Sequence, residues 1–287
     1  VWISGFYGSG KSHLARVLEY LWKDIELPNG AVASSLVDLP IEIKEFFIEL
    51  KTQGRRAGGL WSAAGTLSAA GGTSVKLATL SIVFKAAGLP EDYRLAKFGI
   101  WLKQNGYYEE VRKEIEGEGK EFEKEIRNLY VSPLVSKALL HAYPGLADSE
   151  ADVRNLLRSE FPKAEDISND EFALTLESVL EFQSNNPGKL PLTLLVFDEL
   201  QQFIGDDSDR AILVQEMVQV CTARFGSNLL FIGTGQAALA ADTNLSRLID
   251  RFTVKIELGD KDVERVVRSV VLRKRPDKIS FLQDVLD

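Results

Sequence analysis

GFYGSGKS, at residues 5–12, is the stretch of this sequence that decides its fold. It fits the pattern G-x-x-x-x-G-K-[ST] at every fixed position. Apolar residues precede it at 1–4, and residues 11–22 follow with leucines and a valine at helical spacing. Glycines let such a loop curl until its N–H groups converge on an anion, and the next helix points its N-terminus at the same anion. The stretch therefore predicts a phosphate-binding loop between a buried strand and a helix.

The side chains of this loop have separate expected roles. Lys11 would place a cation on the β- and γ-phosphates of ATP, and the Ser12 hydroxyl would be a ligand for Mg²⁺. We interpret His13 as a helix residue beside the nucleotide rather than as a catalyst. The residues expected to contact nucleotide are Gly5, Gly8, Ser9, Gly10, Lys11, Ser12 and His13.

A second apolar stretch, Leu194–Phe197, ends in two acids, Asp198 and Glu199. Where a phosphate-binding loop is present, an acid at the end of a neighbouring strand holds Mg²⁺ through water. Asp198 fits that role. Glu199 fits the general base that orients and deprotonates the attacking water. The two stretches together predict hydrolysis of a nucleoside triphosphate.

A third apolar stretch, residues 229–233, ends at Thr234. In this class of ATPase a strand commonly lies between the loop-bearing and the acid-bearing strands, with a polar residue at its tip. We predict that Thr234 contacts the γ-phosphate or the attacking water. A turn residue after a buried strand is the alternative interpretation, and Gln236 is a weaker candidate for the same role.

Arginines near the end of the sequence are candidates for a contact in trans. In AAA+ proteins an arginine in this part of the domain reaches the γ-phosphate bound by a neighbouring subunit, where it stabilises transition-state charge. Arg251 and Arg247 are the candidates, and Arg224 is a weaker one. Such a finger implies a homo-oligomer. Surface ion pairs are the alternative role for these side chains.

Composition limits the class of protein further. The net charge of −8 argues against strong autonomous DNA binding. The basic cluster at 265–278 leaves a local DNA contact open, although a favourable cationic bias at a helix C-terminus explains it as well. One cysteine, Cys221, excludes an internal disulfide and indicates a reducing cytoplasm. Two histidines and this cysteine leave no plausible zinc site. No apolar run reaches 18 residues and no signal peptide is recognisable, so we expect no membrane contact.

The periodicity predicts a three-layer α/β fold of the P-loop NTPase type, AAA+-like, with a mostly parallel sheet. We expect a first part of the core at 1–90, a helical insertion at 91–189, a second part of the core at 190–259 and the start of a helical lid at 260–287. Only four residues precede the loop, so we also expect that the chain is part of a longer polypeptide. The further helices are expected at 39–50, 73–87, 133–142, 148–159, 169–183, 209–223, 244–251 and 260–273, the further strands at 60–70 and 253–258, and a loop at 53–59.

Three segments together resemble a known family. They are VWISGFYGSGKSHLARVLEYLW, LLVFDELQQFIG and RFTVKIELGDKDVERVVRSVVLRKRP. They are similar to the large P-loop ATPase of bacteriophage-exclusion (BREX) systems, the BrxC/PglY family, over residues 1–25 and 190–276. By position, Gly5, Gly10, Lys11 and Ser12 would form its Walker A motif, and Asp198 and Glu199 its Walker B motif.

The resemblance implies an AAA+-like core in a long bacterial protein that acts in phage defence. It also implies partners, namely a DNA methyltransferase and a phosphatase-like protein. On this basis we expect ATP hydrolysis to drive assembly or remodelling of a defence complex on DNA. A nucleotide-dependent switch or scaffold of the initiator or STAND type, with slow turnover, is the alternative. A remnant that binds nucleotide without activity is a third possibility.

Overall fold

A computed structural model describes the chain except for residues 27, 38, 71–73, 206, 237–247 and 260–287. Five strands form one sheet in the order β2-β3-β4-β1-β5, and every neighbouring pair is parallel. The strands are β1 (Trp2–Gly5), β2 (Leu60–Gly65), β3 (Leu192–Phe197), β4 (Leu229–Gln236) and β5 (Lys255–Leu258). The predicted α/β class is therefore confirmed, and the described sheet is wholly rather than mostly parallel.

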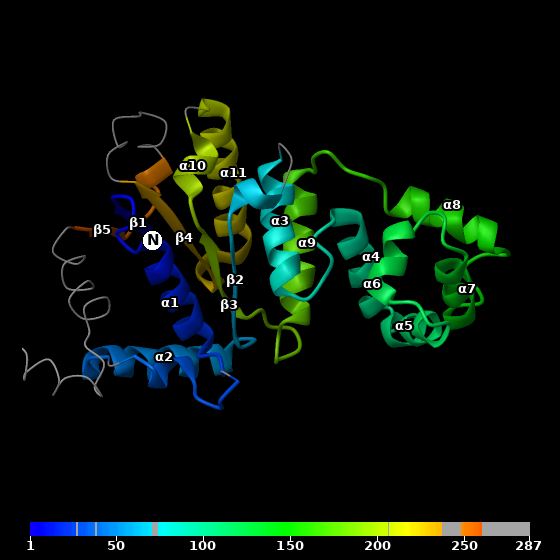
Figure 1. Ribbon diagram of the computed structural model, residues 1–287, viewed down its shortest axis with the longest axis horizontal. Helices are drawn as coiled ribbons and strands as arrows, with labels where there is room; N and C mark the ends of the chain where they lie inside the picture. Colours follow the sequence, from blue (N-terminus) through cyan, green and yellow to red (C-terminus); the bar gives the residue numbers. More distant parts are fainter. Residues whose placement is uncertain (27, 38, 71–73, 206, 237–247, 260–287) are drawn as a thin grey trace, which may run out of the picture.

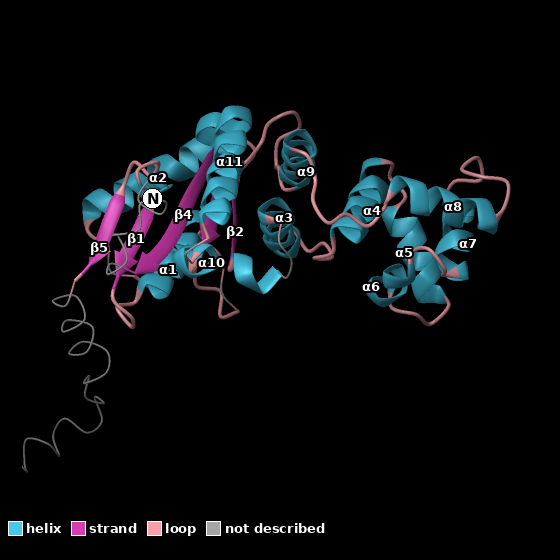
Figure 2. Ribbon diagram, turned by 90° about the horizontal axis from the view of Figure 1, so that it is seen from above, coloured by secondary structure: helices cyan, strands magenta, loops and turns pink. Residues whose placement is uncertain are grey.

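Helices lie on both faces of this sheet (Figures 1 and 2). On one face is α1 (Lys11–Lys23); on the other are α3 (Val75–Ala86), α10 (Leu200–Ile204) and α11 (Ser208–Phe225). Side chains alternate along each strand, and β3 shows this directly. Leu194 and Val196 pack in the cluster that contains α1, whereas Leu195 and Phe197 join the larger cluster on the opposite face. Burial on both faces explains why β3 reads as an uninterrupted apolar run.

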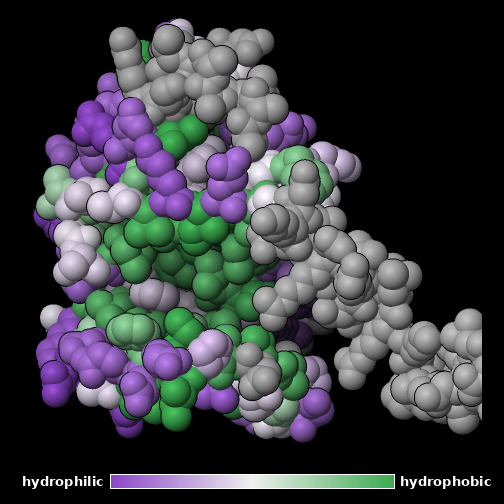
Figure 3. Space-filling view, turned by 90° about the vertical axis from the view of Figure 1, so that its left-hand side faces the viewer, coloured by the Kyte–Doolittle hydropathy of each residue, from purple (hydrophilic) through white to green (hydrophobic). Residues whose placement is uncertain are grey.

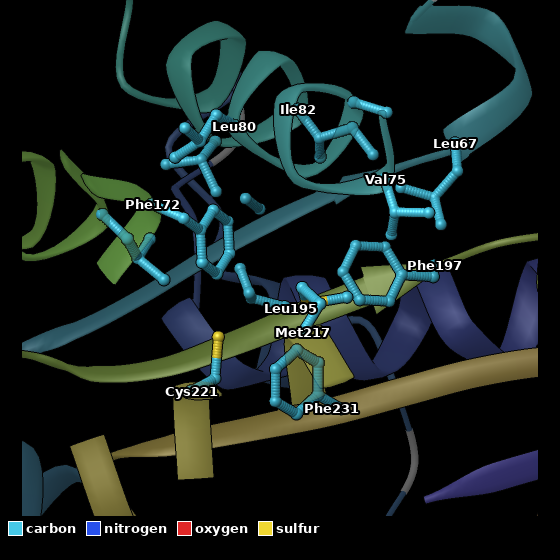
Figure 4. Packing of buried hydrophobic residues seen from close by; sticks show 14 of the residues in the cluster. Leu67, Val75, Leu80, Ile82, Phe172, Leu195, Phe197, Met217, Cys221 and Phe231 are labelled. Atoms are coloured by element: carbon cyan, nitrogen blue, oxygen red, sulfur yellow. The ribbon is translucent and has the colours of Figure 1, made fainter. Parts of the chain in front are cut away.

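The larger cluster forms the main core (Figure 4). The rings of Phe197 and Phe231, from the sheet, stack with their centroids 5.8 Å apart. Met217 and Cys221 of α11 and Phe172 of α9 (Asn169–Phe182) close over them. Burial raises the pKa of the Cys221 thiol, so this cysteine stays protonated and shielded from reagents.

The chain between β2 and β3 is helical and contributes to two separate cores. The helices after α3 are α4 (Tyr93–Gln104), α5 (Tyr108–Gly117), α6 (Phe122–Glu125), α7 (Pro133–Ala142), α8 (Glu150–Glu160) and α9. In α4, Ala96 and Ile100 join the sheet core, whereas Phe98 and Leu102 join a second cluster with α5–α8. The segment therefore combines a lobe with its own core and a helix, α9, that packs against α3 and α11 and contributes to the main core.

The strand predicted at 60–70 is shorter in the structure. It ends at Gly65, and a 3₁₀ turn follows at Leu67–Ala70. A Cβ on Gly65 would lie only 2.9 Å from Ile82 of α3, so the helix packs directly on the backbone there. The turn places Leu67, which is 2% exposed, in the core between the sheet and α3. Small apolar residues at 60–70 gave no sign of where extended structure ends.

Helix α2 (Ile41–Arg56) is longer than predicted, so the expected loop at 53–59 begins only after Arg56. Gly54 lies inside the helix, although glycine usually weakens a helix interior. A Cβ there would fall 2.6 Å from the Leu60 side chain, so close packing against the start of β2 explains this glycine. The highly charged segment at 107–130 does not form one continuous helix. Gly119, with a φ of +75°, lies between α5 and α6 and separates them.

Much of α2 is exposed despite its apolar residues. Its C-terminal half is tied to the end of α1 by an ion pair of 2.5 Å between Lys51 and Asp24. Its N-terminal half leaves Ile41, Phe46 and Ile48 more than 60% exposed. Figure 3, in which the left-hand side of Figure 1 faces the viewer, shows hydrophobic residues gathered on that side of the molecule. No helix in the described part of the chain has the length and apolar character to cross a membrane. The helix predicted at 260–273 and the first half, 244–247, of the one predicted at 244–251 lie outside the described residues.

Candidate functional site

The loop between β1 and α1 has the backbone that its glycines predicted. Gly8 and Gly10 have φ angles of 82° and 88°, in the left-handed region where other residues lose roughly 1–2 kcal/mol. A bond of 3.1 Å from the Ser9 N–H to the Phe6 carbonyl closes the turn. A Cβ on Gly5 would lie 2.5 Å from the Ser9 hydroxyl oxygen, so glycine is needed there for space. The Ser9 hydroxyl is buried and has no hydrogen-bond partner in the described part of the chain.

The Lys11 side chain folds back over this loop. Its Nζ donates to the carbonyl oxygens of Gly5 at 3.1 Å and Phe6 at 2.8 Å. These contacts hold the ammonium group above the loop at the N-terminus of α1, where the helix dipole also favours an anion. The positive charge of Lys11 therefore lies over the loop, next to the N-terminus of α1.

Asp198 joins the loop to the ends of two strands. Its Oδ1 accepts hydrogen bonds from the Ser12 hydroxyl at 3.0 Å and the Thr234 hydroxyl at 2.7 Å. The same oxygen accepts the Glu199 N–H at 3.1 Å, and Oδ2 has no hydrogen-bond partner among the described residues. Parallel strands end at the same edge of a sheet, so β3 and β4 bring their terminal residues beside the loop that follows β1.

Thr234 is buried, with 1% of its surface exposed. Its hydroxyl donates to Asp198 and accepts the Glu199 N–H at 2.8 Å. The only hydroxyl proton of Thr234 is thus directed at the carboxylate, and one lone pair of the oxygen is left. Thr234 therefore positions the acidic pair in this structure, and its contact with phosphate or water stays a prediction.

Glu199 has an unusual backbone. Its φ of 55° is left-handed, which costs a non-glycine residue roughly 1–2 kcal/mol. The Thr234 and Asp198 oxygens hold its N–H in this conformation. Its side chain is exposed and makes no hydrogen bond or ion pair within the described residues. Strained residues of this kind concentrate at functional sites, and the free carboxylate is available as a base.

One cavity of about 630 Å³ collects most of the predicted site residues. Lys11, Ser12 and His13 line it from the loop side, and Glu199 and Thr234 line it from the strand ends. His13 is exposed and lies at the position expected for a helix residue beside the ligand. The cavity is large enough to hold a nucleotide. Its lining includes both Lys11 and Glu199, whereas Asp198 is not among the lining residues.

Five residues of this cavity were not predicted as part of the site, and two of them are the glycines Gly205 and Gly235. Gln201 and Gln202 belong to α10, a short helix that the periodicity did not show, and Tyr7 lies within the loop with 90% of its surface exposed. The position of the two glutamines directly after the acidic pair was the available signal. Residues that follow a catalytic strand end commonly turn back over the site.

The two candidate arginines that the structure describes, Arg224 and Arg251, do not line the cavity. Arg251 is exposed in the turn before β5 and does not line it. Arg224 pairs with Glu177 of α9 at 2.5 Å, which supports the surface ion-pair interpretation for this residue. Arg247 and the basic cluster at 265–278 lie outside the described residues.

The oxygen atoms around Asp198 suit a small hard cation. Within the described ranges no three histidine, cysteine or acidic side chains come together, so a site held by protein carboxylates alone is not formed there. Asp198 and the Ser12 hydroxyl instead offer two oxygen ligands beside the phosphate-binding loop. Mg²⁺ is usually held by one or two protein oxygens, with phosphate and water completing its shell. The residues present therefore fit this metal.

Gly235 packs closely against two side chains, those of Trp2 and Gln201. A Cβ at this position would lie 2.3 Å from the Trp2 ring and 2.7 Å from Oε1 of Gln201. We predict that Gly235→Ala lowers the free energy of unfolding by roughly 1–3 kcal/mol, the usual cost of overpacking a core. Gly117→Ala is the matched control, because a Cβ there meets nothing within 4 Å. Urea unfolding of both variants measures the difference, and equal stabilities would contradict the packing described.

No protein-family model matches the chain. Its function is therefore inferred from the site itself: an ammonium group above a glycine-rich loop, and a carboxylate hydrogen-bonded to the serine that follows that lysine.

Proposed function

We propose that this chain binds ATP with Mg²⁺ and hydrolyses it. The observation that carries the proposal is the 3.0 Å hydrogen bond between the Ser12 hydroxyl and Asp198. It joins residues 186 positions apart, one after β1 and one after β3, so that both would be ligands of one cation. A glycine-rich turn without a ligand gives no reason for such a pairing.

The strand order supports a P-loop NTPase of the AAA+-like type. Strand β4 lies between β1, which carries the loop, and β3, which carries the acids. This is the arrangement expected for that class. It also explains why Thr234, near the end of β4, lines the same cavity as Lys11 and Glu199.

The proposed reaction is in-line attack of water on the γ-phosphorus. Glu199 accepts a proton from the water while the water oxygen bonds to the γ-phosphorus. The bond between the γ-phosphorus and the β–γ bridging oxygen breaks, which releases ADP and inorganic phosphate. Lys11 neutralises charge on the phosphates. Ser12 and Asp198 would hold Mg²⁺, which supplies further charge neutralisation when bound.

The resemblance to BREX ATPases extends the proposal to a cellular role. The domain would couple hydrolysis to assembly or remodelling of an anti-phage complex on DNA, together with a methyltransferase and a phosphatase-like protein. Arg251, exposed in the turn before β5, is available to complete the site of a neighbouring copy in a homo-oligomer.

Phosphate release from Mg–ATP by the purified protein tests the proposal, with and without DNA. We expect steady release that stops when EDTA removes the metal. Multiple turnovers would support the motor, whereas tight binding with very slow release would favour the switch. Absence of both nucleotide binding and phosphate release would contradict the proposed function.

A further inference from the structure

Gln201 is a buried polar residue that the proposed reaction does not use. It is the second residue of α10, two positions after Glu199, and only 6% of its surface is exposed. It nevertheless lines the cavity with Lys11, Ser12 and Thr234. A buried amide normally satisfies its donors and its acceptor, so the bonds of this side chain indicate what it does.

The oxygen of the Gln201 amide has a fixed partner. Oε1 accepts the backbone N–H of Gln236, at the end of β4, over 2.5 Å. A rotated amide would place its own N–H₂ group against that N–H, two donors facing each other, so the bond sets the orientation. The absence of a side chain at Gly235 leaves the space for this contact, since a Cβ there would lie 2.7 Å from Oε1.

The nitrogen of the same amide differs from the oxygen in having no partner among the described residues. Within the residues that the structure describes, no hydrogen bond joins Nε2 to any acceptor, and Nε2 is not among the enclosed atoms without a partner. Because the residue lines the cavity, its two free N–H groups are available to a ligand there. Oriented neutral donors of this kind suit an anionic oxygen, to which hydrogen bonds are stronger than average.

The place of Gln201 indicates which part of the ligand it meets. Gln201 lines the cavity together with Glu199 and Thr234, and Glu199 lies two residues before it in the chain. On the proposed function, on which this step rests, Glu199 activates water for attack on the terminal phosphate. A donor two residues from that base is therefore close to the terminal phosphate rather than to the α-phosphate or the base.

We propose that Gln201 is the residue that distinguishes nucleoside triphosphate from diphosphate, by donating a hydrogen bond from Nε2 to an oxygen of the terminal phosphate. The bond from Gln236 holds the amide in the donating orientation before the ligand arrives. The diphosphate lacks the acceptor, so binding it leaves the Nε2 donors unmatched.

Isothermal titration with Mg–ADP and Mg–adenylyl imidodiphosphate tests this, using wild type and Gln201→Glu. Glutamate keeps the length of the side chain and an oxygen for the Gln236 N–H, but replaces the donor by a second anionic oxygen. We expect the ratio of triphosphate to diphosphate affinity to fall about tenfold or more. Gln202→Glu is the matched control, because it places the same charge on an exposed neighbour in the same cavity. We expect this control to lower the affinities for both nucleotides by a similar factor.

Gln201→Met separates the lost donor from the added charge. We expect the ratio of triphosphate to diphosphate affinity to fall in this variant too, but by a smaller factor. Retained ADP binding shows that the variant is folded. An unchanged affinity ratio in both variants would overturn the role of Gln201 and leave the proposed function standing. Loss of ADP binding in both would show that the amide supports the fold, which also overturns it. If wild type bound neither nucleotide, the proposed function itself would fall.

Discussion

Glu199→Gln is expected to stop ATP hydrolysis while ATP binding is retained. The Glu199 carboxylate lines the cavity and has no hydrogen bond or ion pair with a described residue, so it is free to accept the proton of the attacking water. The amide cannot accept that proton. Loss of a general base typically lowers the rate by about 10²–10⁴-fold. Phosphate release and nucleotide titration of the same protein sample measure the two properties separately.

The backbone of Glu199 makes this substitution informative. The main-chain N–H of residue 199 donates to the side-chain oxygens of Thr234 and Asp198. A glutamine at this position keeps both hydrogen bonds, so the left-handed conformation is preserved. Glu45→Gln, on the exposed face of α2, is the control for removing one carboxylate elsewhere. Hydrolysis at the wild-type rate in Glu199→Gln would show that another group activates the water.

Lys11→Met is expected to weaken ATP binding by about 10- to 100-fold, the loss of a hydrogen bond to a charged group. Its Nζ lies above the loop, 2.8–3.1 Å from two loop carbonyl oxygens, and no second lysine or arginine of the described residues lines this cavity. Methionine keeps the unbranched stem of the side chain. Fluorescence titration with a labelled ATP analogue measures the change.

Lys44→Met is the matched control for this loss of charge, because Lys44 is exposed on α2 and has no ion pair with a described residue. Binding that stays at the wild-type level in Lys11→Met would remove the phosphate-binding role of the loop. A thermal melt of the variant separates loss of ligand from loss of folding, since two loop hydrogen bonds disappear as well.

Local sequence patterns were sufficient for the centre of the site. The glycines and the lysine of residues 5–12 determine a loop whose shape depends on neighbouring residues, so it could be predicted without tertiary contacts. Likewise, the apolar run before Asp198 marks a strand buried on both faces. Both predictions concern interactions within a few residues, where backbone preference and periodicity decide the outcome.

The features that could not be predicted depend on contacts between distant residues. The sequence predicted Gly54 to be a loop residue, but it lies inside α2, where the side chain of Leu60 from β2 packs against it. The end of β2 at Gly65 is set by Ile82 of α3. Gln201 became part of the site only because β4 lies beside β3 and brings Gln236 within 2.5 Å. Strand order and close packing of this kind are not encoded in any short window of sequence.

The division of the helical segment is a further example. Periodicity indicates that α4 is amphipathic, but it does not show that opposite faces of one helix enter two cores. Ala96 faces the sheet core while Phe98 faces the lobe of α5–α8. Only the three-dimensional arrangement separates residues that extend the sheet core from those that build the lobe.

The metal dependence of nucleotide binding tests the central claim most directly. Mg–adenylyl imidodiphosphate is titrated into wild type and Ser12→Ala, each with Mg²⁺ and with EDTA. We predict one nucleotide per wild-type chain, with affinity that falls about tenfold or more in EDTA. We expect a much smaller metal effect in Ser12→Ala, because Ser12 and Asp198 lie 3.0 Å apart and would both be ligands of one cation. Binding that is absent, or that is equally tight with and without Mg²⁺, would contradict the account.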